Sequence, residues 1–159
     1  MQQGEKKVIG RREEVNFPDL HLYGIEAKID TGAYTSAIHC HDIREVIQAD
    51  GSRLIRFQLL DPGHPAYDHQ VFEFRDYSLR DIKSSFGDVQ ARYVIRTRIQ
   101  LFEEIIETEF SLSDRRDLKY PVLIGRALLR KNFLVDVNRK NVARKQRLKA
   151  GKKKKDSNV

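Results

Sequence analysis

The sequence has little of several residue types, and each shortage excludes a class of protein. Cys40 is the only cysteine among 159 residues, so no disulfide can form within the chain, which fits a reducing compartment. Residues 1–8 contain no apolar run that could act as a signal peptide, and no later stretch approaches the roughly 20 apolar residues of a transmembrane helix. The sequence therefore predicts a cytoplasmic protein without membrane association.

Tryptophan is absent and aromatic residues make up 9% of the chain, so the core must rest on Val, Ile, Leu, Phe and Tyr. Apolar and polar residues alternate with a period of two, which favours strands over amphipathic helices. We expect one short helix over residues 127–131 and otherwise an all-β fold. The expected strands are residues 24–29, 54–60, 71–79, 92–99, 104–113, 120–124 and 133–137.

The formal net charge of +7 is not spread evenly along the chain. From Arg139 onward there are ten Lys or Arg residues against the single acid Asp156, which gives this segment +9 and leaves −2 for residues 1–138. We expect one folded domain over residues 1–138 and a basic, disordered tail over residues 139–159, because the tail lacks the apolar residues that would order it. The tail is either a solubilising segment or a weak, salt-sensitive contact for a polyanion such as rRNA.

Two short motifs carry the chemistry. The strand ending at Ile29 runs into Asp30-Thr31-Gly32-Ala33, and Leu123-Ile124-Gly125-Arg126 follows 95 residues after Asp30, counted to Gly125. An Asp-Thr-Gly triplet alone would occur by accident in roughly 3% of chains this long. The pair is more specific, because both halves occur in the order found in one class of peptidase.

This pairing resembles the retropepsins, and the similarity extends to one bacterial and archaeal family. That family is catalogued as ATP-dependent zinc proteases and is found alongside a glutamate ligase that modifies a ribosomal protein. The resemblance implies a retropepsin-like closed β-barrel and an aspartic peptidase that hydrolyses peptide bonds or glutamyl extensions, possible substrates including a glutamylated ribosomal protein. The matching stretches are residues 27–39, 83–87, 92–97 and 123–136.

The chemistry of the motif requires a second carboxyl group. One carboxylate cannot both deprotonate a water and protonate a leaving amine, whereas two carboxyls that share a proton can exchange these roles. With one Asp-Thr-Gly per chain, the partner must be Asp30 of a second copy, so we expect a homodimer on a two-fold axis. The resemblance implies catalytic roles for Asp30, Thr31 and Gly32, and substrate contacts for Ala33, Gly125 and Arg126.

Several residues around Asp30 are expected to support it. Gly32 lets the backbone approach the carboxylate, Thr31 can hydrogen-bond across the axis, and Gly125 is expected to pack beneath the loop where a side chain would clash. Ala33 cannot donate to the carboxylate as Ser or Thr would, so the pair should keep its shared proton to higher pH. We expect the flap that covers the substrate in residues 61–68, where Pro and Gly signal a turn.

Two positions depart from the family. Tyr34 stands where the family commonly has Arg and retroviral enzymes an acidic residue, so the usual partner of Arg126 is missing. Cys40 stands where the family often has Ala. Arg126, with Arg92, Arg96 and Arg98, could line a channel for an acidic peptide, but these three could equally pair with Glu107 and Glu109 on a solvated strand face.

A metal site is the weaker alternative. His39 and His41 are ligand-type residues that could share a strand face, but no third ligand stands at a recognisable spacing, although His64 or His69 could be recruited by the fold. We therefore assign no metal ligand and expect no cofactor, and the absence of a Walker-type loop leaves ATP without support. The alternatives to a peptidase are a non-catalytic adaptor that holds a ribosome or RNA through the tail, and a zinc-dependent hydrolase.

Overall fold

The computed structural model describes residues 5–114 and 119–157 of the chain, with side chains described as far as residue 151. Most of the ordered backbone is in strands, as the sequence predicted. The strands are β1 (Lys7–Ile9), β2 (Arg12–Phe17), β3 (Leu22–Ile29), β4 (Ser36–Ile47), β5 (Arg53–Leu59), β6 (Val71–Phe74), β7 (Tyr77–Lys83), β8 (Val89–Leu101), β9 (Glu104–Ser113), β10 (Val122–Ile124) and β11 (Phe133–Val135). The helices are the 3₁₀-helix η1 (Pro18–Leu20), α1 (Arg126–Asn132) and α2 (Val142–Ser157).

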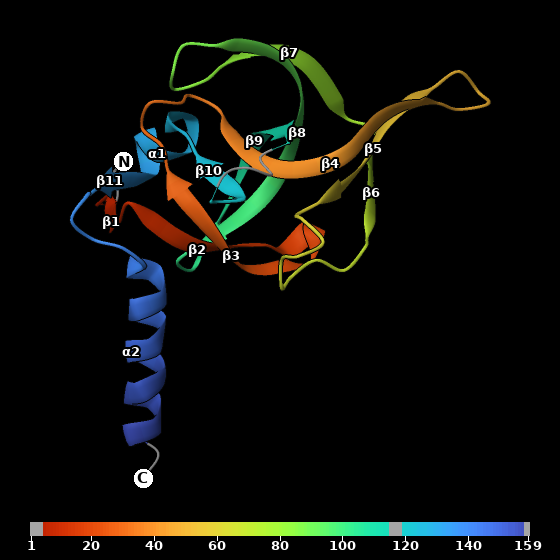
Figure 1. Ribbon diagram of the computed structural model, residues 1–159. Helices are drawn as coiled ribbons and strands as arrows, with labels where there is room; N and C mark the ends of the chain where they lie inside the picture. The colour runs from red at the N-terminus through yellow and green to blue at the C-terminus, as the bar shows by residue number, and fades with distance from the viewer. Residues whose placement is uncertain (1–4, 115–118, 158–159) are drawn as a thin grey trace.

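Within the described residues, nine strands form one sheet in the order β10-β3-β2-β8-β9-β4-β5-β6, with β7 paired to β8. The short strand β10 lies between two others, because it pairs parallel with β3 and antiparallel with β4 (Figure 1). The strands β1 and β11 form a separate parallel pair. The sequence predicted a closed barrel. The strand pairings establish a mostly β fold in which β10 contacts both β3 and β4.

The alternation read from the sequence corresponds to burial in two neighbouring central strands, β8 and β9. Ile95, Thr97 and Ile99 of β8 are buried, as are Phe110 and Leu112 of β9, so both strands turn their apolar face to one core. Of the three arginines suggested to pair with Glu107 and Glu109 on the opposite face, Arg96 shows this pairing. There the guanidinium of Arg96 lies 3.4 Å from a carboxylate oxygen of Glu107 and 3.9 Å from one of Glu109.

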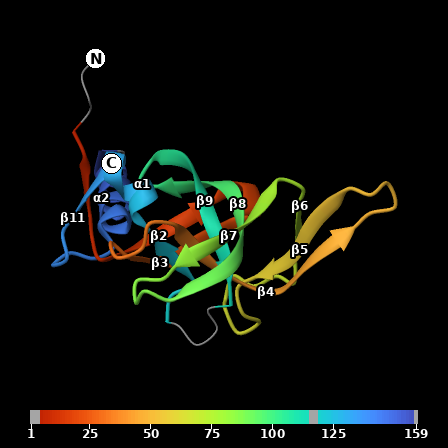
Figure 2. The same cartoon turned by 90° about the horizontal axis from the view of Figure 1, so that it is seen from above.

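One expected strand is two strands in the structure. The chain bends at Arg75 and Asp76, which separates β6 from β7. The reason is a change of partner, since β6 pairs with β5 and β7 pairs with β8. Residues 71–79 therefore bridge two parts of the sheet, which a period of two cannot reveal. The long β4–β5 hairpin projects from the body at this side (Figure 2).

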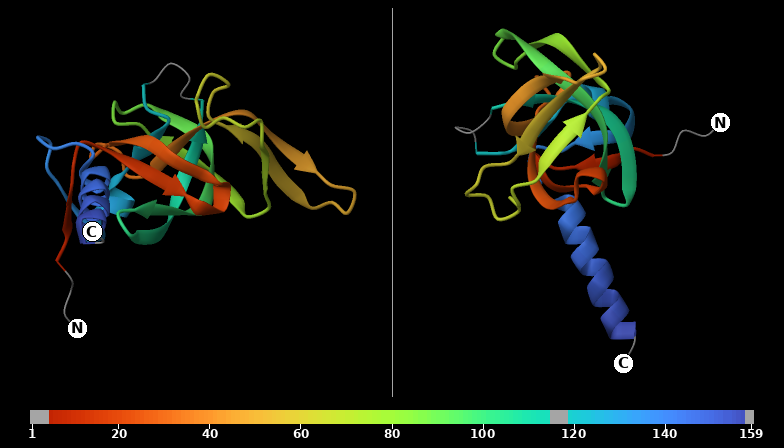
Figure 3. Two further views of the ribbon diagram at one scale, coloured as in Figure 1. Left: turned by 90° about the horizontal axis from the view of Figure 1, so that it is seen from below. Right: turned by 90° about the vertical axis from the view of Figure 1, so that its right-hand side faces the viewer.

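The C-terminal segment differs from the disordered tail that the sequence predicted, because Val142–Ser157 forms the helix α2. Lys, Arg, Ala and Gln, which dominate this segment, are good helix formers. The start of the helix is also fixed to the body: the buried Glu13 carboxylate accepts hydrogen bonds from the backbone N–H groups of Val142 (3.1 Å), Ala143 (3.0 Å) and Gly10 (2.8 Å). From there α2 extends away from the sheet (Figure 3).

None of the helices in the described ranges, residues 5–114 and 119–157, is both long enough and apolar enough to cross a membrane.

Candidate active site

Asp30 begins the loop between β3 and β4, and β10 holds that loop from beneath. The backbone N–H of Asp30 donates to the Ile124 carbonyl over 2.9 Å, and the N–H of Ala33 donates to the Asp30 carbonyl over 3.3 Å. The loop is therefore anchored to the sheet at its first residue and turns back at its fourth. This arrangement follows from the position of β10, which lies beside the end of β3 and the start of β4.

Gly125 and the first turn of α1 support the rest of the loop. A Cβ atom at Gly125 would lie 2.6 Å from the Tyr34 carbonyl oxygen, so the close packing expected at this glycine is present. Next to it, the N–H of Arg126 donates to the Ala33 carbonyl (2.8 Å) and that of Ala127 donates to the Tyr34 carbonyl (2.9 Å). The two motifs that the sequence placed 95 residues apart are thus in direct contact.

Among the described residues, the Asp30 carboxylate accepts two hydrogen bonds. The backbone N–H of Gly32 donates to Oδ1 over 3.1 Å, and the Ser85 hydroxyl donates to Oδ2 over 2.7 Å. Gly32 leaves little room for a side chain, because a Cβ atom there would lie 3.3 Å from Asp30 Oδ1 and 3.2 Å from Ser85 Cβ. Asp30 is half-buried, whereas Thr31 and Gly32 are exposed, so the carboxylate lies near the surface, next to the tip of the loop.

Ser85 is a residue that the sequence analysis missed as part of the site. It lies in the turn of the β7–β8 hairpin, which is closed by hydrogen bonds from Ser84 N to the Asp88 carbonyl (2.8 Å) and from Gly87 N to the Ser84 carbonyl (3.0 Å). Gly87 has a φ of +92°, a conformation that favours glycine. The signal in the sequence was the resemblance to the family over residues 83–87. No strand or core pattern explained why these residues would match.

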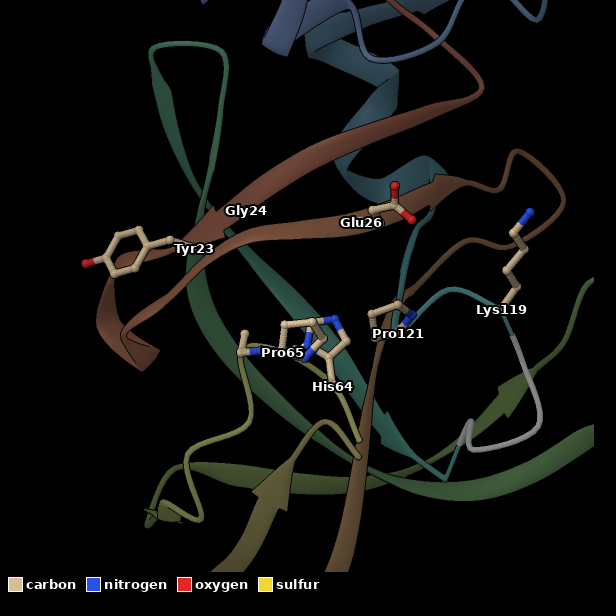
Figure 4. A pocket seen from close by; sticks show the side chains of 8 residues that line it. Tyr23, Gly24, Glu26, His64, Pro65, Lys119 and Pro121 are labelled. Carbon is tan, nitrogen blue, oxygen red and sulfur yellow. Dashed lines mark hydrogen bonds between the residues drawn. The ribbon is translucent and has the colours of Figure 1, made fainter. Parts of the chain in front are cut away.

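The flap was predicted in the wrong place. Residues 61–68 do not cover Asp30; instead His64 and Pro65 line a different cavity, together with Glu26, Lys119 and Pro121 (Figure 4). The segment that reaches over Asp30 is the β7–β8 turn, residues 84–88, which we call the flap turn. Turn-forming residues mark where a chain bends, but they do not say which loop the fold brings to the carboxylate.

A cavity of about 630 Å³ opens between the Asp30 loop and the flap turn. Arg126 lies in its wall, donates from Nη1 to the Thr31 carbonyl over 2.9 Å, and has its guanidinium carbon 5.9 Å from the centre of the Tyr34 ring. Tyr34 therefore meets Arg126 through its ring face, a cation–π contact, where the family commonly places a charged residue. Other residues of the wall are Gly32, Lys83, Ser85 and Phe86, whose side chain is 94% exposed.

The structure separates the predicted site residues into two groups. Asp30, Gly32 and Arg126 lie at or beside the cavity, and Thr31 lies on the exposed tip of the loop. Ala33 is a buried residue of the loop itself, and Gly125 is buried beneath the loop. Both act in its packing in the single chain. Their roles in substrate binding and catalysis stay predictions.

The arginines of β8 do not form the suggested channel with Arg126. Arg98 forms two hydrogen bonds with the Asp19 carboxylate, at 2.9 and 2.5 Å, which lowers the pKa of that carboxyl below its usual value. Arg96 is paired with the glutamates of β9. Both belong to a solvated strand face, so Arg126 and Lys83 are the basic side chains that line the cavity.

A family model described as RimB-like, retropepsin-like aspartic endopeptidase RimB, matches residues 8–146. A probable alpha-L-glutamate ligase of Shewanella halifaxensis is 36% identical over 135 residues, and one of Desulfotalea psychrophila is 33% identical over the same length. In both cases the match covers 82% of this chain, which spans only 28% of the length of these relatives.

Among solved structures, a Legionella pneumophila protein of unknown function is similar with a TM-score of 0.69 and 26% sequence identity. The match covers 87% of this chain and 99% of that one. The family match spans β1 to the start of α2 and includes the Asp30 loop, β10 and the flap turn. The chain therefore belongs to the RimB-like family of retropepsin-like aspartic endopeptidases.

Proposed function

We propose that this chain is an aspartic-type peptidase that hydrolyses peptide bonds or glutamyl extensions with a water held between the Asp30 carboxylates of two chains. The observation that carries the proposal is the position of Asp30, half-buried at the start of a loop that β10 and α1 fix from below. A carboxylate fixed beside the exposed tip Thr31-Gly32 can meet its copy across a two-fold axis. The contact of β10 with both β3 and β4 also supports the closed barrel that we infer for this sheet.

In the proposed mechanism, one Asp30 carboxylate removes a proton from the water as it attacks the scissile carbonyl. The other Asp30, protonated at that moment, donates its proton to the carbonyl oxygen or to the leaving nitrogen. The first Asp30 then holds the proton taken from the water, so the two groups have exchanged roles. Gly32 adds no side chain of its own beside the carboxylate, and Thr31 is exposed where a second loop would meet the first. The flap turn would close over the bound peptide and exclude water from the cavity.

We propose an acidic substrate, a peptide or protein that carries added glutamates, possible examples including a glutamylated ribosomal protein. Lys83 and Arg126 are the basic side chains in the cavity wall, which also contains Asp81 and has Asp30 beside it, so these two are where a negatively charged segment would bind. The names of the curated relatives, probable alpha-L-glutamate ligases, support the same class of substrate. The buried thiol of Cys40, the only cysteine, fits a reducing compartment, and we propose a cytoplasmic location.

The proposal is tested by cleavage of a glutamate-extended peptide by the purified chain and by Asp30→Asn. We expect Asp30→Asn to lose at least a hundredfold in kcat/KM, because Asn cannot take up the proton of the water. The matched control is Asp50→Asn at the tip of the β4–β5 hairpin, where the amide can still accept the Ser52 hydrogen bonds. Equal cleavage by Asp30→Asn and by the natural chain would refute the mechanism.

A second candidate is an adaptor that holds a ribosome or another RNA through its basic C-terminal helix. It is favoured by the structure of α2, which extends from the body and has no acidic residue before Asp156. Such a contact would be independent of sequence and would weaken steeply with salt. Salt-sensitive co-sedimentation with ribosomes that survives Asp30→Asn, in a protein without peptidase activity, would favour the adaptor.

A further inference from the structure

A second cluster of polar side chains lies on β4, apart from the Asp30 cavity. His39 is only 2% exposed, and its Nε2 lies 2.6 Å from Oδ1 of Asp61. His41 is two residues further along the same strand, and its ring centre lies 6.3 Å from that of His39. Each of His39, His41 and Asp61 offers a ligand atom, and these three atoms all lie within 4.8 Å of one another.

The fold explains how the third residue reaches the two histidines. Residues two apart on a strand share a face, which places His39 and His41 together. Strand β5 ends at Leu59, which pairs with Cys40 between the two histidines. The chain then turns sharply, because Leu60 has a φ of +67° and its N–H donates to the His39 carbonyl over 3.3 Å. Asp61 is the next residue and is therefore directed back to His39 across the strand pair.

Two further observations suit a ligand rather than a simple hydrogen bond between His39 and Asp61. Nδ1 of His41 is buried and has no hydrogen-bond partner among the described residues. A buried polar atom of this kind is costly unless something binds it. In addition, Oδ1 of Asp114 lies 3.8 Å from Nδ1 of His39. A carboxylate on the far nitrogen of an imidazole is the usual second partner of a metal-binding histidine.

Cys40 does not belong to this cluster, although it stands between the two histidines. Its side chain points to the opposite face of β4, into the core, and burial raises the pKa of its thiol to about 12. The thiol therefore faces away from the two imidazoles and is not available as a ligand. The donor set consists of two imidazoles and one carboxylate.

We propose that His39, His41 and Asp61 bind one divalent transition-metal ion, with Zn²⁺ as the best fit to this donor set. Two imidazoles and a carboxylate, with a fourth position open to water, form a donor set that suits Zn²⁺ and also accepts Co²⁺. Asp114 would orient His39 from behind. The ion would join β4 to the loop after β5 and so hold the start of residues 61–68 against the sheet.

The site is separate from the Asp30 carboxylate, so the inference goes beyond the proposed function and its test does not depend on peptidase activity. The full chain is freed of metal with a chelator, dialysed, and titrated with Zn²⁺ alone or Co²⁺ alone. We expect one ion per chain, visible Co²⁺ absorption typical of nitrogen and oxygen ligands, and a rise in Tm that the chelator reverses.

Variants identify the ligands. His41→Asn and Asp61→Asn should bind either ion at least tenfold more weakly, and Asp114→Asn should weaken binding by about 10-fold to 100-fold if it orients His39. The matched control is His21→Asn, an exposed histidine at the end of η1 that lies outside the cluster. It should bind as the natural chain does.

Less than one ion per chain, an unchanged Tm, or binding by His41→Asn equal to that of the natural chain would overturn the proposal. If a variant fails to fold, NMR of the natural chain with bound Co²⁺ still tests the site. Bound Co²⁺ should broaden the NMR signals of the His39 and His41 imidazoles and spare those of His21. Broadening that is absent, or equal at all histidines, would also count against the site.

Discussion

At Gly125 the geometry leaves no space for a side chain. The Cβ atom of an alanine would lie 2.6 Å from the Tyr34 carbonyl oxygen and 2.9 Å from the Thr35 carbonyl carbon. Both atoms belong to the backbone of the loop that carries Asp30, so they can retreat only if the loop itself moves. This single residue therefore connects the second motif to the position of the Asp30 carboxylate.

We predict that Gly125→Ala destabilises the chain by about 1–3 kcal/mol through overpacking and lowers cleavage by displacing Asp30. Thermal unfolding and kcat/KM on the same peptide measure the two effects. Gly63→Ala is the matched control, because a Cβ atom there would have no neighbour within 4 Å. A Gly125→Ala chain with unchanged Tm and activity would contradict the packing role of this glycine.

At the same scale, the Ser85 hydroxyl joins the flap turn to the Asp30 carboxylate in the single chain. We predict that Ser85→Ala loosens the turn, since this is the hydrogen bond that the described residues show between residues 84–88 and Asp30. Amide hydrogen exchange at Gly87 and Asp88 should become faster, while exchange in β9 should not change. Ser78→Ala, on the same hairpin and away from the carboxylate, is the control.

Unchanged exchange in Ser85→Ala would mean that the strand pairing of β7 with β8 alone holds the turn in place. The functional counterpart is a change in KM, because a looser flap turn binds substrate less well but leaves the carboxylate chemistry intact. A fall in kcat with an unchanged KM would instead assign Ser85 to the chemical step.

At the scale of elements, α2 shows how one side chain can order a segment that has no apolar face. The first N–H groups of a helix have no partner within the helix, and the Glu13 carboxylate on β2 satisfies two of them. The same carboxylate complements the positive end of the helix dipole. Arg144 and Arg147 add a second contact, each 3.6 Å from a carboxylate oxygen of Glu14.

We predict that Glu13→Gln lowers stability by about 1–2 kcal/mol and releases the start of α2. Gln presents one acceptor and one donor to a pocket formed by three N–H groups, so at least one N–H loses its partner. Cleavage by trypsin at Arg144 should become faster and helical circular dichroism should fall. Glu26→Gln on the exposed face of β3 should change neither.

At the scale of the whole molecule, the proposed site is incomplete in one chain, because each chain has a single Asp-Thr-Gly. Activity should therefore depend on the concentration of dimer, and its dependence on total protein should be steeper than linear near the dissociation constant. A chain that cleaves with the same specific activity at every dilution, while sedimenting as a monomer, would refute the shared site.

Mixing experiments test the shared site directly. We predict that an excess of Asp30→Asn chains lowers the activity of a fixed amount of natural chain, because mixed dimers hold only one complete Asp30 carboxyl. Equal excess of Asp50→Asn, altered far from the loop, should raise activity instead, since it contributes working subunits. Activity that is indifferent to added Asp30→Asn would show that each chain works alone.

The sequence by itself determined the mostly β fold, the approximate bounds of most strands, and the pairing of the Asp30 and Gly125 motifs. The strands could be read because alternation with a period of two is a local property, and the expected strand over residues 104–113 has the bounds of β9, for example. The packing of Gly125 against the Asp30 loop was expected from the resemblance to the retropepsins, and the structure shows this contact.

Only the tertiary structure decided which distant residues complete each site. Ser85 is 55 residues from Asp30, Asp61 is 22 residues from His39, and Val142 is 129 residues from Glu13. A hydrogen bond between such partners leaves no local pattern in the sequence, since it depends on how loops of the sheet are brought together. For this reason the sequence placed the flap in residues 61–68, did not bring Asp61 to His39 and His41, and predicted disorder where α2 forms.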